Sequence, residues 1–114
     1  MEAIDVARRA VEVAGDKQAT DIVLLDVRGI SNFADFFVIC SGESKRQIEA
    51  IRDDIGQVLK KEGVSPHHYE GTVDSGWLVL DFGSIIVHIF APLEREYYQL
   101  DRLWSKIAPV ITIQ

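Results

Sequence analysis

The sequence has few of the residues that hold small domains together through covalent bonds or metal ions. It contains one cysteine and three histidines in 114 residues, whereas a structural zinc site needs about four such ligands at workable spacing. The lone cysteine, Cys40, cannot form an internal disulfide. A chain of this length buries enough apolar surface to fold without either. We therefore expect no metal, no cofactor and an ordinary packed core.

Positive charge is also scarce, and no apolar run is long. Lys and Arg number 12 against 18 Asp and Glu, a net charge of -6, whereas proteins that neutralise phosphates need clustered basic side chains. No stretch approaches the ~18 apolar residues of a membrane span, and acidic Glu2 and Asp5 stand where a signal peptide carries basic residues. We expect little or no direct nucleic-acid binding, no membrane partner and a cytoplasmic location. An acidic domain is steered toward basic protein surfaces.

No linker or repeat divides the chain, so residues 1–114 are expected to form a single domain. Apolar residues recur three and four apart where we expect helices, and form short runs where we expect buried strands. The pattern predicts an α/β fold, of the α+β kind, in which a mixed sheet is flanked by helices. The expected elements are helices at 4–14, from Ser44 to Gly63 and from Leu93 to Trp104, and strands at 22–27, 36–40, 77–82 and 85–90, with 110–113 either a short closing strand or a loose end.

The hairpin around Gly83-Ser84 is the most informative stretch. Glycine at the first of two loop positions is typical of a type II′ turn, and this turn sets the register of the two strands. One face of the hairpin then carries six large apolar side chains, in the pairs Phe82–Ile85, Leu80–Val87 and Leu78–Ile89, which we expect to be core. The other face mixes aromatic, aliphatic and ionisable groups, in the pairs Asp81–Ile86, Val79–His88 and Trp77–Phe90. This second face is typical of neither core nor ordinary solvated surface.

The chain offers weak candidates for catalysis. Cys40, His88 and Asp81 supply the residue types of a nucleophile triad, but Cys40 follows the apolar run Phe36 to Ile39, where burial raises the pKa of a thiol. His88, diagonal to Asp81 in the hairpin, is a candidate general base held by a carboxylate. The commoner alternative is a histidine that is hydrogen-bonded to a strand neighbour and stabilises the sheet face. We predict no catalytic residue.

The segment Ser41-Gly42-Glu43-Ser44 is the candidate for holding a phosphate group. It joins a predicted strand to a helix amino terminus, where backbone amides can bind anions. It lacks the Walker lysine and the dinucleotide glycine spacing, and Glu43 would repel an anion. Nucleotidyl transfer also needs two carboxylates one residue apart on a strand to hold Mg²⁺, and Asp26 and Asp81 each stand alone. A nucleotide-binding or nucleotidyltransferase-like enzyme is kept as the alternative function, with a purely structural homodimer as a third.

Three segments carry motifs that occur together in one protein family. They are Ala34 to Ser44 followed by Arg46-Gln47-Ile48; Glu70-Gly71 with Trp77, Leu80 to Gly83, Val87-His88 and Phe90; and Arg95, Tyr98, Leu100, Leu103 and Trp104. With the leading helix these segments cover nearly the whole chain. In this combination the sequence resembles the ribosomal silencing factor family, also called Iojap-like proteins.

The resemblance implies a factor without known catalysis that binds the large ribosomal subunit. The site is a protein of the intersubunit face, the fourteenth in large-subunit numbering (uL14), where the bound factor sterically blocks joining of the small subunit and represses translation when nutrients are limiting. The resemblance also implies a nucleotidyltransferase-like fold lacking catalytic carboxylates, a homodimer as a frequent state, and a bacterial cytoplasm as the location.

We expect the contacts with the ribosomal protein to come from the second face of the hairpin and from the last helix. In that helix Leu93, Tyr97, Leu100 and Trp104 form a stripe that we expect to pack, and Tyr98 projects away from the stripe. Aromatic residues would anchor the partner and acidic residues would pair with its basic groups. The predicted contact residues are Trp77, Val79, Asp81, Ile86, His88, Tyr98 and Asp101.

Overall fold

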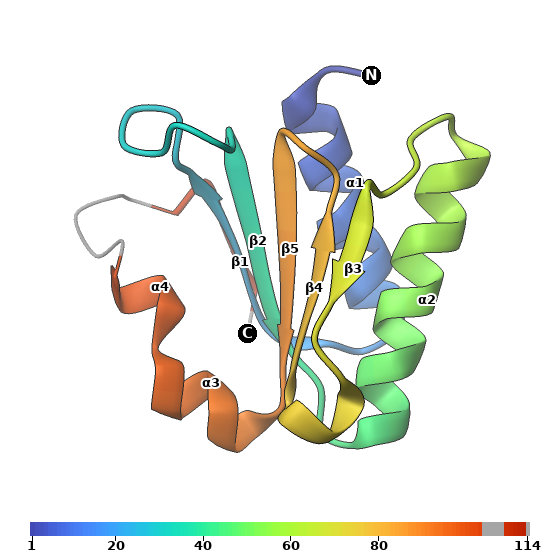
Figure 1. Cartoon of the computed structure of the whole chain (residues 1–114), viewed down its shortest axis with the longest axis vertical. Helices are drawn as coiled ribbons and strands as arrows, with labels where there is room; N and C mark the ends of the chain where they lie inside the picture. The colour runs from blue at the N-terminus through green and yellow to red at the C-terminus, as the bar shows by residue number, and fades with distance from the viewer. Residues whose placement is uncertain (104–108, 114) are drawn as a thin grey trace.

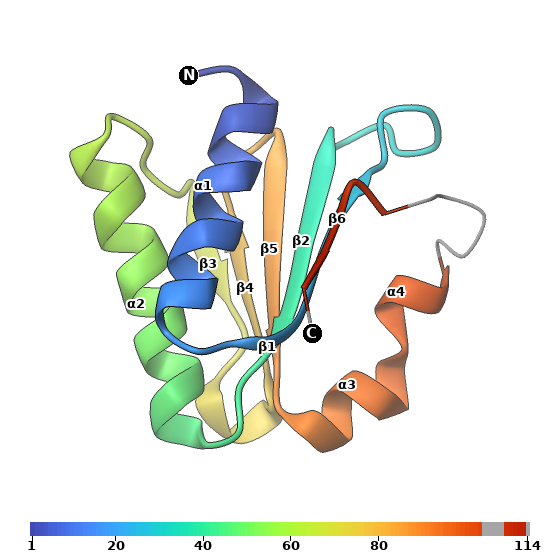
Figure 2. The same ribbon diagram turned by 180° about the vertical axis from the view of Figure 1, so that it is seen from behind.

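The computed structural model describes residues 1–103 and 109–113. Six strands form one sheet in the order β3-β4-β5-β2-β1-β6, with β2 and β5 parallel and all other neighbours antiparallel. Helices α1 and α2 cover one face, and α3 and α4 lie on the other (Figures 1 and 2). The elements are α1 Ala3–Asp16, β1 Thr20–Asp26, β2 Phe36–Ser41, α2 Lys45–Lys61, β3 His68–Glu70, the 3-10 turn η1 Val73–Ser75, β4 Trp77–Asp81, β5 Ile85–Phe90, α3 Pro92–Tyr98, α4 Leu100–Leu103 and β6 Ile111–Ile113.

This architecture confirms the predicted α/β fold with a mixed sheet flanked by helices. The segment 110–113, for which the sequence left two possibilities, contributes the edge strand β6 beside β1. No helix within residues 1–103 and 109–113 is both long and apolar enough to cross a membrane.

Helix α2 illustrates how local sequence positions an element. The hydroxyl of Ser44 accepts a hydrogen bond from the backbone N–H of Gln47 at 3.1 Å, which caps the first turn. The Gln47 amide donates to the carbonyls of Lys17 and Gln18 at 3.1 and 3.0 Å, tying the start of α2 to the end of α1. Apolar residues three and four apart then face the sheet and are buried: Ile48, Ile51, Ile55 and Leu59.

The hairpin of β4 and β5 has the predicted register. Leu80 pairs with Val87 and Asp81 with Ile86, and Gly83 adopts φ +88°, a conformation that glycine accepts without strain. The Asp81 carboxylate accepts a hydrogen bond from the Gly83 N–H at 2.7 Å, which fixes the turn. The predicted core face is confirmed, because its six side chains are all buried: Leu78, Leu80, Phe82, Ile85, Val87 and Ile89.

A second apolar cluster lies on the opposite face of the sheet, between the strands and α4. It contains Phe37, Ile39 and Phe90 with part of β1, and Leu100 packs against it. This cluster covers more of the second hairpin face than the sequence predicts: His88 is 8% exposed and Phe90 is fully buried. Its neighbours in the central sheet therefore enclose His88, which leaves little of its side chain accessible for the predicted contact with a partner.

The predicted last helix is interrupted. Gln99 adopts φ 46°, so α3 ends at Tyr98 and α4 begins at Leu100 with a new direction. Residues on either side of Gln99 do not share one helical face, and the predicted packing stripe is wrong for Leu93 and Tyr97, which are 76% and 81% exposed. Leu100 does pack, and Trp104 lies outside the described residues.

Candidate functional site

The sheet face opposite α1 and α2 has a groove over β4, next to the edge strand β3. Its volume is about 260 Å³. Strand β3 is exposed along its whole length, and it brings Glu70 opposite Val79 of β4. The groove is lined by Glu70, Gly71, Ser75, Trp77, Val79 and Tyr98.

Aromatic rings form one wall of this groove. The Trp77 indole stacks on Phe90 with ring centroids 5.0 Å apart and contacts the Tyr98 ring at 4.6 Å. Tyr98 stays 44% exposed, and Trp77 is partly buried. The Trp77 Nε1–H donates a hydrogen bond to Nδ1 of His88 at 3.1 Å. Such a wall offers a partly desolvated, rigid apolar surface to a partner.

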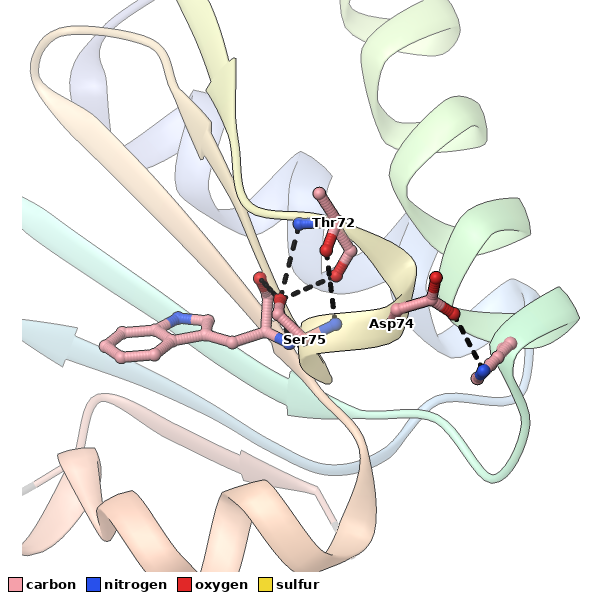
Figure 3. Close-up of polar contacts among 5 residues, drawn as sticks. Thr72, Asp74 and Ser75 are labelled. Atoms are coloured by element: carbon pink, nitrogen blue, oxygen red, sulfur yellow. Dashed lines mark hydrogen bonds and ion pairs between the residues drawn. The ribbon is translucent and has the colours of Figure 1, made fainter.

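The turn before β4 fixes the backbone of Trp77 (Figure 3). The Ser75 hydroxyl accepts hydrogen bonds from the backbone N–H groups of Thr72 and Trp77, both at 3.3 Å, and lies 2.7 Å from the Thr72 carbonyl, to which it donates. The Thr72 hydroxyl in turn accepts from the Ser75 N–H at 3.2 Å. Asp74 forms an exposed ion pair with Lys45 in the first turn of α2 at 2.7 Å. These contacts join the start of β4 to α2.

Gly71 is required where the chain enters this turn. It has φ +84°, and a Cβ atom there would collide with the carbonyl oxygen of Trp77. Any larger residue at position 71 would displace the backbone that carries the indole.

The buried imidazole of His88 is uncharged at neutral pH. Burial lowers its pKa from 6.5 to about 4, because the charged form loses hydration. Its Nδ1 accepts from Trp77, and the Asp81 carboxylate instead accepts from Gly83 and lies 3.4 Å from His68 Nε2. The interpretation of His88 and Asp81 as a general base and its carboxylate is therefore wrong, whereas a histidine hydrogen-bonded within the sheet is confirmed.

Cys40 is a core thiol. It is fully buried in β2, and desolvation raises its pKa to about 12. A nucleophile needs an accessible thiolate, so the triad reading of Cys40, His88 and Asp81 fails.

The segment Ser41 to Ser44 borders a second cavity of about 260 Å³ at the carboxyl ends of β2 and β5. Arg95 donates a hydrogen bond to the Ser41 hydroxyl at 3.0 Å and lies 3.4 Å from the Asp101 carboxylate. The cavity is also lined by three acids, Asp21, Glu43 and Glu96. A phosphate group would meet more negative than positive charge there, so the geometry gives the nucleotide-binding alternative no support.

The seven predicted contact residues fall into separate places. Trp77, Val79 and Tyr98 line the groove together. Asp81 lies at the hairpin turn, Ile86 packs on the second cluster, and His88 is buried beneath Trp77. Asp101 lines a different cavity of about 320 Å³, with Asp21 and Thr112.

The sequence analysis missed three lining residues, Glu70, Gly71 and Ser75, because they fall between the predicted helix that ends at Gly63 and the predicted strand that begins at Trp77. The signal that identifies Glu70 is its pairing with Val79 in the sheet, which is a long-range contact.

Comparison with known proteins supports a single family. Residues 1–114 match the family described as "Ribosomal silencing factor during starvation". Ribosomal silencing factor RsfS of Halalkalibacterium halodurans is 36% identical over 110 residues, which cover 96% of this chain and 93% of that protein. RsfS of Haemophilus influenzae is 41% identical over 95 residues, which cover 83% of this chain and 93% of that protein. Chloroplastic protein Iojap of Zea mays is 32% identical over 109 residues, covering 96% of this chain and 47% of that longer protein.

Solved structures share the fold as well as the sequence. A crystal structure of a Chromobacterium violaceum protein superposes with a TM-score of 0.88 at 30% identity, covering 92% of this chain and 88% of that chain. A crystal structure of a Bacillus halodurans protein superposes with a TM-score of 0.78 at 34% identity, covering 96% of this chain and 97% of that chain. The family model matches the whole chain, and bacterial RsfS proteins align with it over most of their own length. This chain therefore belongs to the ribosomal silencing factor (RsfS or Iojap) family, whose members are silencing factors and not enzymes.

Proposed function

We propose that this protein binds the large ribosomal subunit through protein uL14 and thereby blocks joining of the small subunit. Translation would then be repressed under nutrient limitation, in the cytoplasm of a bacterium. Two findings support the proposal: membership of a family of ribosomal silencing factors, and an accessible groove with an aromatic wall on a rigid sheet. The observation that carries the site is the half-buried indole of Trp77 beside the exposed ring of Tyr98.

Interface energetics favour this surface over the rest of the molecule. A few aromatic anchors in partly desolvated pockets carry most of the binding energy of a protein interface. Trp77 and Tyr98 have this setting, and the exposed ring of Tyr97 packs edge-on against Tyr98 at 5.0 Å. Glu70, with a side chain that is 63% exposed, brings negative charge to the rim, where it complements a basic partner.

The other predicted contact residues have supporting roles in this proposal. Asp81 and Asp101 keep side-chain exposures of 26% and 34% and would act as rim charges, Asp81 at the hairpin turn and Asp101 at the separate cavity beside α4. Ile86 supports the aromatic wall from the second cluster. Rim charges tune association rate and salt dependence more than affinity.

The test is co-sedimentation of the protein with purified large subunits in a sucrose gradient. Trp77→Ala removes an anchor worth roughly 2 kcal/mol or more, so we expect binding to weaken by about 30-fold or more while the protein stays folded. Phe33→Ala is the matched control, because Phe33 is an aromatic residue that is 66% exposed on a loop outside the groove. Binding by Trp77→Ala equal to that by Phe33→Ala would contradict the proposed site.

A core variant separates docking from folding. Leu80 lies on the opposite face of the same strand and is fully buried, so Leu80→Ala should lower the free energy of unfolding by about 2–5 kcal/mol. In thermal melts, Leu80→Ala should have a clearly lower melting temperature than Trp77→Ala. If the two variants lose equal stability, the indole serves the core and not a partner.

The proposal includes self-association as a homodimer, the state that the family resemblance implies. Sedimentation equilibrium over a range of concentrations measures it directly. A monomer at all concentrations would remove the homodimer from the proposal and leave ribosome binding intact.

A further inference from the structure

His88 lies directly beneath the aromatic wall of the groove. It is 8% exposed, in the middle of β5, and its ring packs edge-on against Phe37 at 5.2 Å and stacks with Phe90 at 6.4 Å. The one side-chain hydrogen bond of His88 among the described residues is with the indole N–H of Trp77 at 3.1 Å. Of the groove residues, Trp77 contacts the imidazole through its indole ring and its N–H, and Val79 is the cross-strand partner of His88.

This hydrogen bond fixes the tautomer of the ring. Because Nδ1 accepts a hydrogen bond from the Trp77 N–H, the neutral imidazole carries its own proton on Nε2. Within the described residues, buried Nε2 has no hydrogen-bond partner. A buried donor without a partner lowers stability, whereas an apolar ring of the same shape would avoid the cost. A phenylalanine here would avoid this cost, and the indole of Trp77, which is only partly buried, would donate to water instead, so stability alone does not account for the histidine.

We infer that His88 is a positioning residue that holds the Trp77 indole in its docking orientation. The inference rests on the proposed function, because it concerns how the same groove recognises the ribosomal protein. Trp77 begins β4 and is only partly buried, so packing alone leaves its ring freedom to reorient. The hydrogen bond to His88 removes that freedom before the partner arrives, which lowers the entropy cost of binding.

The same hydrogen bond defines what the partner meets. The indole N–H is already used inside the protein, so Trp77 presents ring carbons and a π-face to the groove. The complementary group on the partner is then an apolar or cationic side chain rather than a hydrogen-bond acceptor.

The test compares a variant that lacks a hydrogen-bond acceptor for the indole N–H of Trp77 with a variant that keeps one. His88→Phe keeps a ring but lacks Nδ1, and His88→Asn places an amide oxygen near the position of Nδ1. We expect His88→Phe to weaken binding to purified large subunits about three- to tenfold, the effect of one net hydrogen bond, while melting at or above the temperature of the wild type. His88→Asn should bind within about twofold of the wild type.

Two further readouts exclude a merely structural role. In ¹⁵N-labelled protein the indole N–H of Trp77, assigned by its absence in Trp77→Phe, should exchange with solvent faster in His88→Phe than in the wild type or His88→Asn. In the Trp77→Phe background, where no indole N–H exists, His88→Phe should have no further effect on binding.

The outcomes separate this inference from the proposed function. If His88→Phe binds like the wild type while Trp77→Ala loses binding, the positioning role is overturned and the docking site stands. A loss on His88→Phe that persists in the Trp77→Phe background also overturns it. If the wild-type protein does not bind large subunits, the proposed function fails and the positioning role falls with it.

Discussion

Burial of His88 also contributes to how the stability of the protein responds to pH. Burial lowers its pKa to about 4 in the folded protein from 6.5 in an unfolded chain. Between these values the unfolded chain holds a proton that the folded protein lacks, so the free energy of unfolding rises with pH across this window and levels off above pH 6.5. We predict that this residue lowers the free energy of unfolding by up to about 3 kcal/mol as the pH falls from 6.5 to 4.

Urea titrations at pH 4.5 and 7 measure this dependence. His88→Phe removes the titrating group, and its unfolding free energy should vary less between the two pH values than that of the wild type. Equal variation in both proteins would assign the pH dependence to other groups.

Cys40 should be chemically silent in the folded protein. Its thiol is fully buried, and desolvation raises its pKa to about 12, so almost no thiolate is present at pH 8. We predict no reaction with a thiol reagent such as dithionitrobenzoate in buffer and rapid reaction of one equivalent in 8 M urea, about the concentration that unfolds small domains. Rapid labelling of the native protein would show that β2 opens locally.

At the scale of elements, helix α2 and edge strand β3 meet at a glycine. A Cβ atom at Gly56 would lie 2.6 Å from the hydroxyl oxygen of Tyr69. Alanine stabilises a helix interior by about 1 kcal/mol relative to glycine, but here the gain is offset because the Tyr69 ring must move. We predict that Gly56→Ala stabilises the Tyr69→Phe protein by about 1 kcal/mol and the wild type by less. Urea unfolding of the four proteins measures this, and an equal gain in both backgrounds would rule out the contact.

The hairpin and α2 were predictable because their signals are local. Gly83 marks the turn, alternation from Leu78 to Leu80 marks the core face, and Ser44 caps α2. The break at Gln99 carries no such signal, since a non-glycine residue takes the left-handed conformation there. Periodicity across Gln99 consequently predicts one continuous helix with the wrong residues packed.

The candidate site was predictable only in part for a similar reason. Alternation along β4 and β5 identifies the second hairpin face, but the extent of its burial depends on β2 and α4, which are distant in sequence. Trp77 and Val79 stay accessible beside edge strand β3, whereas His88 one strand inward is enclosed. The tertiary structure thus determines which residues of this hairpin face are accessible to a partner and which are buried beneath them.

At the scale of the whole molecule, the proposed silencing requires only that the protein occupies its site on the large subunit, and it involves no catalysed reaction. The domain measures 34 × 32 × 23 Å, so one bound copy on the intersubunit face would hold the subunits apart. We predict that an excess of protein over separated subunits lowers the fraction of joined ribosomes in a sucrose gradient, and that Trp77→Ala does not. Inhibition by Trp77→Ala equal to that by the wild type would show that silencing does not use the groove.

The most direct test of the account is to identify what lies against the groove on the ribosome. Cys40 is buried, so Glu70→Cys introduces one accessible thiol at the groove rim, to which a short photo-crosslinker is attached. After irradiation with purified large subunits, we predict cross-linking to uL14 from position 70 and none from the control Phe33→Cys. Cross-linking from position 70 to another ribosomal protein or to ribosomal RNA, or to uL14 only from position 33, would contradict the account.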